Sequence, residues 1–327
     1  MSVPASLGYC SRRLAFGRFA QGRRRPQTGF NKLAVAFTSG QHRCGNRRYF
    51  VKMQSVGLRP AGLAEETPRR QAVSAQAKIV VFGHSHLGAL LAAFAQQVSQ
   101  GQQSCNLVSY QFLRTDRPHI VNIDDTWRYN PECEQELLQL IAETRPAAVI
   151  SMLQGEQAVA AGMIMPEPRF DFYFPGEETD VPERGEEIVP FDLLFEACKT
   201  EYQLVSDLLD RLRRYIAVPF FAFCPPPPID DPEFILASNP KHANIAEHLA
   251  TRGLPATHWR YRIWKIHMAA LRTIYEEHGV RFVEPPGDAI GSNGCLDARF
   301  RSDVFHANAA YGQLLLRQVQ QLIKQAP

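Results

Sequence analysis

The stretch from Lys78 to Gly88 (KIVVFGHSHLG) constrains the fold of this chain more than any other segment. Its apolar run, 79–82, ends at Gly83 and leads through Ser85 into an Ala/Leu-rich segment. A short apolar run that ends at a glycine turn is typical of a buried strand in a parallel sheet. In such sheets ligands bind at the carboxyl ends of the strands. Ser85 is therefore predicted to lie where ligands bind, with its backbone N–H free at the start of a helix.

The alternation of strand and helix recurs along the chain. Apolar runs predict further strands at 106–112, 147–153, 218–224 and 280–283. Helical spacing, caps and breakers predict helices at 87–99, 132–144, 191–215 and 255–278, and a last one after Asn308. Residues 113–131 are predicted to form a polar loop. About five alternations predict an α/β fold, a three-layer α/β/α sandwich around a flavodoxin-like, mostly parallel five-stranded sheet.

Composition divides the chain into two regions. Residues 1–64 contain twelve Lys and Arg and no Asp or Glu, with little periodicity. We expect 1–75 to be a basic, disordered extension; a transit-like segment and a misassigned start, with Met53 as the true one, stay open. Residues 76–327 are predicted to form one domain with an insertion around 158–190. The aromatic cluster of the insertion, 170–174, is interpreted either as a lid or side wall for substrate or as a surface excursion pinned by its rings.

Charge and cysteine content limit the partners. Beyond residue 64 the chain carries 24 basic and 33 acidic side chains, and a mildly acidic domain argues against a nucleic-acid partner. No apolar run approaches the length of a membrane span, so no membrane partner is predicted. The seven cysteines include no Cys-x-x-Cys pair. They predict a reducing, cytoplasmic location without a disulfide framework or zinc site.

Two segments carry residue types suited to nucleophilic catalysis. Ser85 follows the first strand, and Asp303 and His306 precede the last helix. A serine nucleophile needs an imidazole to take its proton and an acceptor to fix the tautomer of that imidazole. An Asp three residues before a His can turn back onto the ring. Each residue also has a purely structural interpretation, Ser85 as a helix cap and the other two as a hydrogen-bonded loop pair.

Together the two segments resemble the SGNH/GDSL hydrolase superfamily. Gly83-His-Ser-His stands at its first signature, Gly-Asp-Ser-Leu, and Asp303-Val-Phe-His306-Ala-Asn fits its last, Asp-x-x-His. The resemblance implies that Ser85 is the nucleophile, His306 the general base and then acid, and Asp303 the residue that orients His306. It implies no cofactor and no metal. His84, His86 and Asn308 are accessory candidates, of which the two histidines are interpreted as turn residues.

The chain departs from this family at the oxyanion hole. The family has a Gly after the second strand, and here no Gly occurs between 102 and 154. The family also has Gly-x-Asn after the third strand, where this chain has Gln154-Gly-Glu-Gln. The resemblance then implies that Ser85, Gln154, Gly155 and Gln157 bind substrate and the oxyanion, with a Gln amide in place of Asn. Loss of one such donor typically slows catalysis by about 10²–10³-fold.

These residues predict a serine-dependent hydrolase of ester bonds, an esterase or deacylase of a small or carbohydrate-linked acyl ester. A non-catalytic binding module on the same scaffold and an O-acyltransferase with the same serine stay open. Gly83-His-Ser-His86 is also similar to the Gly-His-Thr-His element of metal-dependent phosphoesterases. That element comes late in its family, after other metal ligands, whereas here it comes first. Its position argues against a metal enzyme.

Overall fold

The computed structural model describes residues 77–102, 105–113, 116–153, 155–176, 187–238 and 243–325. The predicted extension 1–75 lies outside the described residues, and so do Gln154 and residues 177–186 of the predicted insertion. None of the helices in the described ranges is long and apolar enough to cross a membrane.

Five parallel strands form the central sheet. They are β1 (Lys78–Gly83), β2 (Asn106–Gln111), β5 (Ala148–Met152), β8 (Phe220–Phe223) and β9 (Arg281–Val283). They are hydrogen-bonded in the order β2-β1-β5-β8-β9. Numbered along the chain, this is the order 2-1-3-4-5 of flavodoxin-like sheets. The predicted fold class is confirmed.

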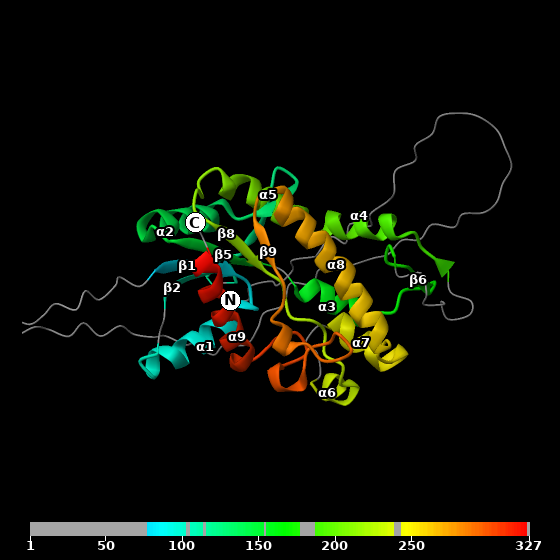
Figure 1. Ribbon diagram of the computed structural model, residues 1–327. Coiled ribbons are helices and arrows are strands. Elements are labelled where there is room, and N and C mark those ends of the chain that lie inside the picture. The colour runs from blue at the N-terminus through cyan, green and yellow to red at the C-terminus, as the bar shows by residue number, and fades with distance from the viewer. Residues whose placement is uncertain are drawn as a thin grey trace, which may run out of the picture.

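Helices cover both faces of the sheet (Figure 1). One face carries α1 (Leu87–Ser99) and α9 (Ala309–Gln325), and the other carries α2 (Pro131–Thr144), α5 (Gln203–Arg213) and α8 (Thr257–Glu277). Successive side chains of β1 pack against the helices on opposite faces of the sheet, because side chains alternate along a strand. Ile79 and Val81 pack under α1 and α9, whereas Val80 and Phe82 pack toward α2, α5 and α8. All four side chains are fully buried.

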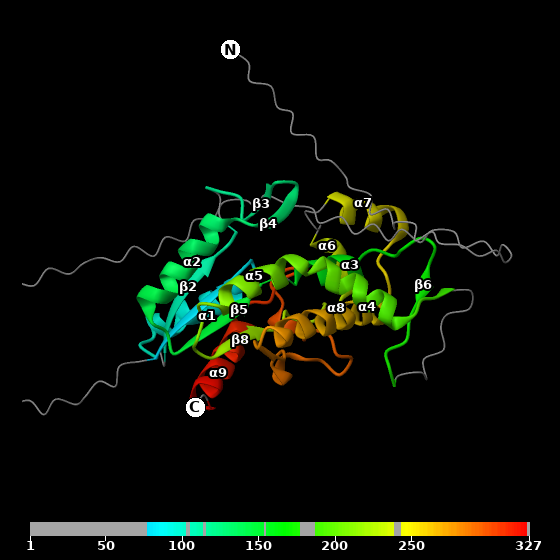
Figure 2. The same cartoon turned by 90° about the horizontal axis from the view of Figure 1, so that it is seen from above.

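The predicted polar loop 113–131 is wrong in part, because it contains a hairpin. β3 (Ile120–Ile123) pairs antiparallel with β4 (Thr126–Tyr129), directly before α2 (Figure 2). Asp124 and Asp125 form the turn with positive φ angles of 52° and 59°. Two residues with positive φ match the twist of a tight hairpin, and Asp tolerates this conformation. Strands of four residues with mixed polarity gave no clear periodic signal.

The helix predicted over 191–215 is divided in two. α4 (Phe191–Glu201) and α5 (Gln203–Arg213) are separated at Tyr202, whose φ and ψ of −95° and 11° leave the helical range. The Tyr202 side chain is buried, and its hydroxyl is 3.0 Å from Nδ1 of His267 on α8. The apolar side chains at helical spacing are buried on both sides of the break, except Leu194, which is partly buried; the buried ones are Cys198, Val205, Leu208, Leu209 and Leu212.

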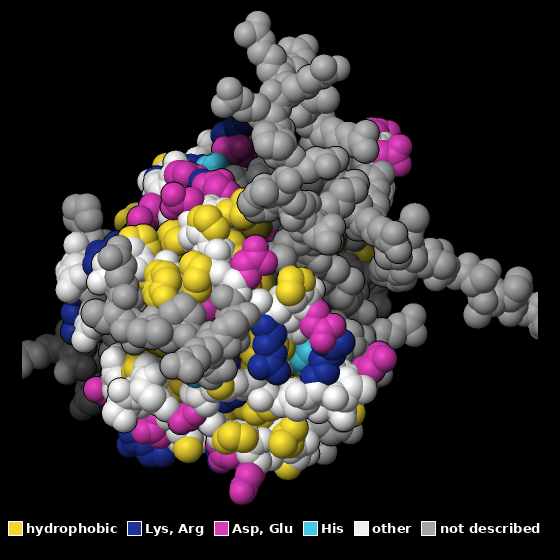
Figure 3. Space-filling model, turned by 90° about the vertical axis from the view of Figure 1, so that its right-hand side faces the viewer, with side chains coloured by type: hydrophobic (Ala, Val, Ile, Leu, Met, Phe, Trp, Pro, Cys, Tyr) yellow, Lys and Arg dark blue, Asp and Glu magenta, His cyan; other side chains and the backbone are white. Residues whose placement is uncertain are grey.

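The described part of the insertion packs on α8. It contains α3 (Glu156–Gly162), β6 (Phe170–Asp171) and β7 (Glu187–Ile188), and α6 (Pro232–Ala237) and α7 (Ala243–Arg252) follow further along the chain. Phe170 and Phe172 are buried edge-on against Trp259. Arg262 pairs with Asp171 at 2.8 Å and lies over the Phe172 ring. These contacts favour the second interpretation, in which the insertion is a surface segment held on the domain by its aromatic side chains. On the surface seen in Figure 3, the described hydrophobic side chains form small separate groups among charged ones.

A close contact between α1 and α9 sets the relative position of the segment that contains Ser85 and the segment that contains Asp303 and His306. A Cβ on Gly312 of α9 would overlap the carbonyl oxygen of Ala89 on α1, so only glycine permits this approach. Ala89 is four residues after Ser85, and Gly312 is four residues after Asn308. The contact therefore holds the start of α1 beside the start of α9.

The Gly312→Ala substitution is expected to lower the free energy of unfolding by about 1–3 kcal/mol, because the added methyl group overpacks this contact. Gly88→Ala in α1 is the matched control, since a Cβ there meets no atom within 4 Å. That control should leave stability unchanged or raise it by up to about 1 kcal/mol. Urea denaturation of both variants gives the comparison, and equal stabilities would contradict the close contact.

Candidate active site

The turn after β1 presents Ser85 at the carboxyl end of this strand, which lies between β2 and β5. A Cβ on Gly83 would overlap the carbonyl of Met152 on β5, so glycine is required there. The amides of Leu87 and Gly88 donate to the carbonyls of His84 and Ser85, which turns the chain into α1. Ser85 is partly buried, and neither its hydroxyl nor its N–H makes a hydrogen bond within the described part of the chain. Its side chain does not cap α1.

Asp303 and His306 form a pair on the loop before α9. Nδ1 of His306 is 2.8 Å from Oδ1 and 2.9 Å from Oδ2 of Asp303. The amides of Phe305 and His306 also donate to Oδ1 of Asp303, at 2.8 and 2.9 Å. The carboxylate accepts the Nδ1 proton, so Nε2 of the neutral ring is left with its lone pair. This is the tautomer that a general base needs.

The same pair shifts both pKa values. Burial by itself would lower the pKa of His306, but the hydrogen bond and the negative charge of Asp303, aided by Glu156, outweigh it and raise that pKa. Burial would raise the pKa of Asp303, and the hydrogen bonds from His306 and from the Phe305 amide outweigh it and lower that pKa. Imidazolium and carboxylate therefore stabilise each other in this loop.

Asn308 fixes the end of the loop and begins α9. Its side-chain oxygen accepts from the amides of Ala310 and Tyr311, at 2.9 and 3.2 Å, so the predicted N-cap is confirmed. Its amide nitrogen donates to the carbonyls of Arg299 and Arg301, at 2.8 and 3.1 Å. The accessory residue Asn308 thus ties the loop to the helix.

The two segments meet through a pair of histidines. The ring of His86, the residue after Ser85, lies 5.2 Å from that of His306 between centroids, at an angle of 49°. Nε2 of each ring is buried and makes no hydrogen bond to the described residues. The proton-accepting role that the resemblance implies for His306 predicts a hydrogen bond between Ser85 and Nε2 of His306, and this bond is not formed here. Such catalytic contacts are commonly loose without substrate.

The predicted oxyanion residues are placed only in part. Gly155 lies next to His86, because a Cβ on Gly155 would be 2.9 Å from Nε2 of His86 and would overlap Pro225. Its φ of 127° also requires glycine. The Gly155 amide donates to Oε1 of Gln157 at 3.3 Å, so that amide is engaged within its own turn. Gln154 lies outside the described residues.

His84 belongs to an aromatic wall beside the turn. Its Nε2 is 3.4 Å from the hydroxyl of Tyr129, and its ring stacks on Tyr129 and meets His119 edge-on at 5.1 Å. Burial first, and then the charges of His119 and His86, lower the pKa of His84 to about 3. Sequence reasoning missed His119 and Tyr129, because they flank a hairpin that it did not predict.

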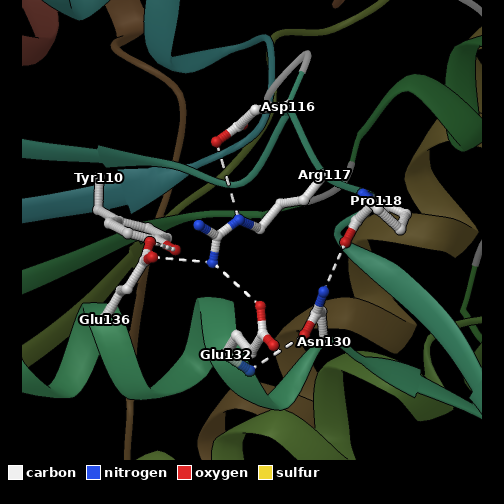
Figure 4. Close-up of polar contacts among 7 residues, drawn as sticks. All are labelled: Tyr110, Asp116, Arg117, Pro118, Asn130, Glu132 and Glu136. Atoms are coloured by element: carbon white, nitrogen blue, oxygen red, sulfur yellow. Dashed lines mark hydrogen bonds and ion pairs between the residues drawn. The ribbon is translucent and has the colours of Figure 1, made fainter.

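Arg117 holds the loop that carries His119 against α2 (Figure 4). Its guanidinium pairs with Glu136 at 2.8 Å and with Glu132 at 3.3 Å. The Asn130 side chain caps α2 through the Glu132 amide and donates to the carbonyl of Pro118, at 3.0 Å in both cases. This network places His119 over His84.

The histidines of this region do not form a metal centre by their geometry. Across the described ranges, no group of three or more His, Cys, Asp or Glu side chains is arranged to hold a metal ion. The resulting site has a free hydroxyl at Ser85, an oriented imidazole at His306 and a second buried imidazole at His86. These groups lie at the carboxyl edge of a parallel sheet, and a hydroxyl near an oriented imidazole is an arrangement that can support nucleophilic chemistry.

Comparison with solved structures finds chains described as an acetyltransferase domain, a GDSL-like lipase and a lipase/acylhydrolase. The periplasmic domain of a lipopolysaccharide acetyltransferase from Salmonella Paratyphi A is 12% identical, with a TM-score of 0.44 over 76% of this chain and 84% of its own. A GDSL-like lipase from Bacteroides thetaiotaomicron is 12% identical, with a TM-score of 0.35 over 78% and 91%. A lipase/acylhydrolase from Enterococcus faecalis is 10% identical, with a TM-score of 0.32 over 75% and 96%.

No protein-family model and no curated protein matches the sequence. At these low identities and TM-scores, the function has to be inferred from the residues of this chain.

Proposed function

We propose that this protein is a serine-dependent hydrolase of ester bonds, with Ser85 as nucleophile, His306 as general base and acid, and Asp303 as the group that orients His306. The observation that carries the proposal is the double contact of Nδ1 of His306 with Asp303, in a loop whose imidazole lies against the Ser85 turn. A histidine held in this way keeps Nε2 available for a proton.

The reaction would proceed in two halves. Oγ of Ser85 attacks the ester carbonyl carbon while Nε2 of His306 takes the hydroxyl proton. The alcohol leaves with that proton, and an acyl group stays on Ser85. Water then attacks the acyl carbon, gives its proton to His306 and releases the carboxylic acid, and Ser85 recovers its proton. Asp303 stabilises the imidazolium that forms in each half.

The oxyanion would be stabilised by the Ser85 amide, which makes no hydrogen bond within the described residues. It lies just before α1, where unpaired N–H groups and the helix dipole favour negative charge. Gly155, which lies next to His86, and Gln157, in the first turn of α3, are proposed to complete the substrate contacts together with Gln154.

The proposed substrate is a small or carbohydrate-linked acyl ester, and the proposed location is cytoplasmic. The described cysteines are buried and none forms a disulfide with another described cysteine, which suits a reducing compartment; they are Cys105, Cys133, Cys198, Cys224 and Cys295. No cofactor has a role in the proposed reaction.

A panel of p-nitrophenyl esters with acyl chains from acetyl to octanoyl tests the proposal. We expect release of p-nitrophenolate that is unaffected by a chelator and fastest for the short chains. A protein that binds these esters or acetylated sugars without turnover would be a binding module, and turnover that a chelator abolishes would indicate metal chemistry. Either result would overturn the proposal.

The pH dependence of kcat/KM reports the state of His306, which must be neutral to accept a proton. Because its pKa is raised, activity should increase with pH through a midpoint above the ordinary value of 6.5. Asp303→Asn removes the charge that raises the pKa and leaves the burial that lowers it, so the midpoint should move to lower pH. Asp297→Asn, at a carboxylate that pairs with Arg299, is the control and should not move it. An unchanged midpoint in Asp303→Asn would contradict the assigned pairing.

A further inference from the structure

A pocket of about 390 Å³ lies between β4, α2 and α5, and the proposed reaction gives it no role. Three arginines line it, Arg128 of β4 and Arg211 and Arg214 at the end of α5. None of the described residues that are proposed to act on the ester lines this pocket. Its volume is in the range of small-molecule sites, so the pocket is a separate candidate for binding.

The positive charge of this pocket exceeds its negative charge. Among the described residues that line it, Glu134 of α2 is the one carboxylate, and its Oε2 accepts from Nε of Arg211 at 2.7 Å. The side chains of Arg128 and Arg214 form no hydrogen bond or ion pair within the described part of the chain. Three guanidinium groups against one carboxylate leave a net charge of +2 around the pocket. Clustered charges of one sign attract a ligand of the opposite sign.

The terminal guanidinium nitrogens are the donors that a ligand can reach. Arg128 is partly buried, and only its Nε is both shielded from solvent and unpaired, so its two unpaired Nη groups keep accessible surface. Glu134 occupies Nε of Arg211, whose side chain is 35% exposed, and leaves both Nη groups of that residue without a partner. Arg214 is exposed. A guanidinium edge with two donors fits the oxygens of a phosphate group.

The arginines come from two separate elements. Basic residues near the end of a helix complement its dipole, which accounts for Arg211 and Arg214. It does not account for Arg128, which lies on a strand. Successive side chains of a strand point to opposite faces, and the ring of Tyr129 stacks on His84. Arg128 is therefore turned away from His84 and toward α5, so the sequence brings a third positive charge to this pocket.

We propose that this pocket binds the phosphate monoester group of a small phosphorylated molecule. A phosphate monoester carries a charge of about −1.5 to −2 at neutral pH, which matches the net charge of the lining residues. Its oxygens would accept from the accessible guanidinium nitrogens. Leu138 and Tyr215, which is 69% exposed, also line the pocket and offer apolar surface to the rest of the ligand. The inference does not depend on ester hydrolysis at Ser85.

Isothermal titration calorimetry with phenyl phosphate tests the inference. We expect one binding site per chain. Arg128→Gln and Arg214→Gln should each weaken binding by at least about 10-fold, the effect of losing a charge-assisted hydrogen bond. Arg128→Lys keeps the charge but not the two-donor edge, so its affinity should lie between that of Arg128→Gln and that of the wild type. Because neither side chain has a described partner, urea denaturation should show these variants to be as stable as the wild type.

Arg317→Gln is the matched control, because it removes the same charge at an exposed position of α9 and should bind phenyl phosphate as the wild type does. Ser85→Ala should also bind as the wild type does, since the pocket is separate from the candidate active site. Phenyl sulfate has a similar shape but a single negative charge, and it should bind more weakly. The inference is overturned if phenyl phosphate does not bind, if Arg317→Gln weakens binding as much as Arg128→Gln does, or if Ser85→Ala abolishes it. Equal affinity for phenyl sulfate would also contradict the proposed phosphate monoester.

Discussion

Ser85→Ala is expected to lower the turnover of p-nitrophenyl acetate by at least about 10³-fold, because the variant has no oxygen to carry the acyl group. The residual rate would come from substrate binding and oxyanion contacts. The Ser85 hydroxyl makes no hydrogen bond to a described residue, so its loss should change the free energy of unfolding by less than about 0.5 kcal/mol. Initial rates and urea denaturation measure the two effects.

Ser99→Ala is the control for this variant. Ser99 lies at the end of α1 and donates only to the carbonyl of Gln96. Its loss should leave the rate unchanged. If Ser85→Ala turns over substrate as fast as the wild type, Ser85 is not the nucleophile.

His306→Ala is expected to lower kcat by about 10⁴-fold or more, because Ser85 then has no base. Asp303→Asn should lower kcat by about 10⁴-fold, because the amide that replaces the carboxylate does not fix the tautomer of the His306 ring. When two residues act as a unit, the effects of their substitutions on the rate do not add. The double variant Ser85→Ala/His306→Ala should therefore be no slower than the slower single variant. Rates of the four proteins on one substrate give the comparison. Multiplied losses in the double variant would show that the two residues act independently.

Most of the sheet could be predicted from sequence, because buried parallel strands are continuous apolar runs. The run before Gly83 and the run before Gln154 became β1 and β5, the neighbours at the centre of the sheet. The short hairpin β3–β4 escaped prediction because its strands are half exposed and its turn, Asp124-Asp125, lacks glycine. The break at Tyr202 depends on a tertiary contact with His267, which no local pattern reveals.

The part of the candidate site whose residues are close together in the sequence could be predicted. Asp303 and His306 are three residues apart, so their pairing follows from one loop. The burial of His86 could not be predicted from sequence, which favours a turn residue at this position. Its Nε2 lies next to Gly155, which is far along the chain. A signal was present, because the family that the chain resembles has a leucine there, and a histidine in an apolar place needs a partner.

The packing of α1 on α9 explains how the distant segments reach one edge of the sheet. Gly312 and Ala89 set the approach of the two helices, and Asn308 joins the loop of Asp303 and His306 to the start of α9. Changes at this contact should therefore affect catalysis through geometry as well as stability. A 1 Å displacement of a reacting group can cost about 10²-fold in rate.

Covalent labelling is the most direct test of the central claim, that His306 activates the hydroxyl of Ser85. A fluorophosphonate reacts with a serine only where a base activates its oxygen, and peptide mass spectrometry locates the adduct. The account predicts one adduct per chain on Ser85, which is lost in Ser85→Ala and strongly slowed in His306→Ala. An adduct on another residue, or labelling of Ser85 at an equal rate without His306, would contradict it.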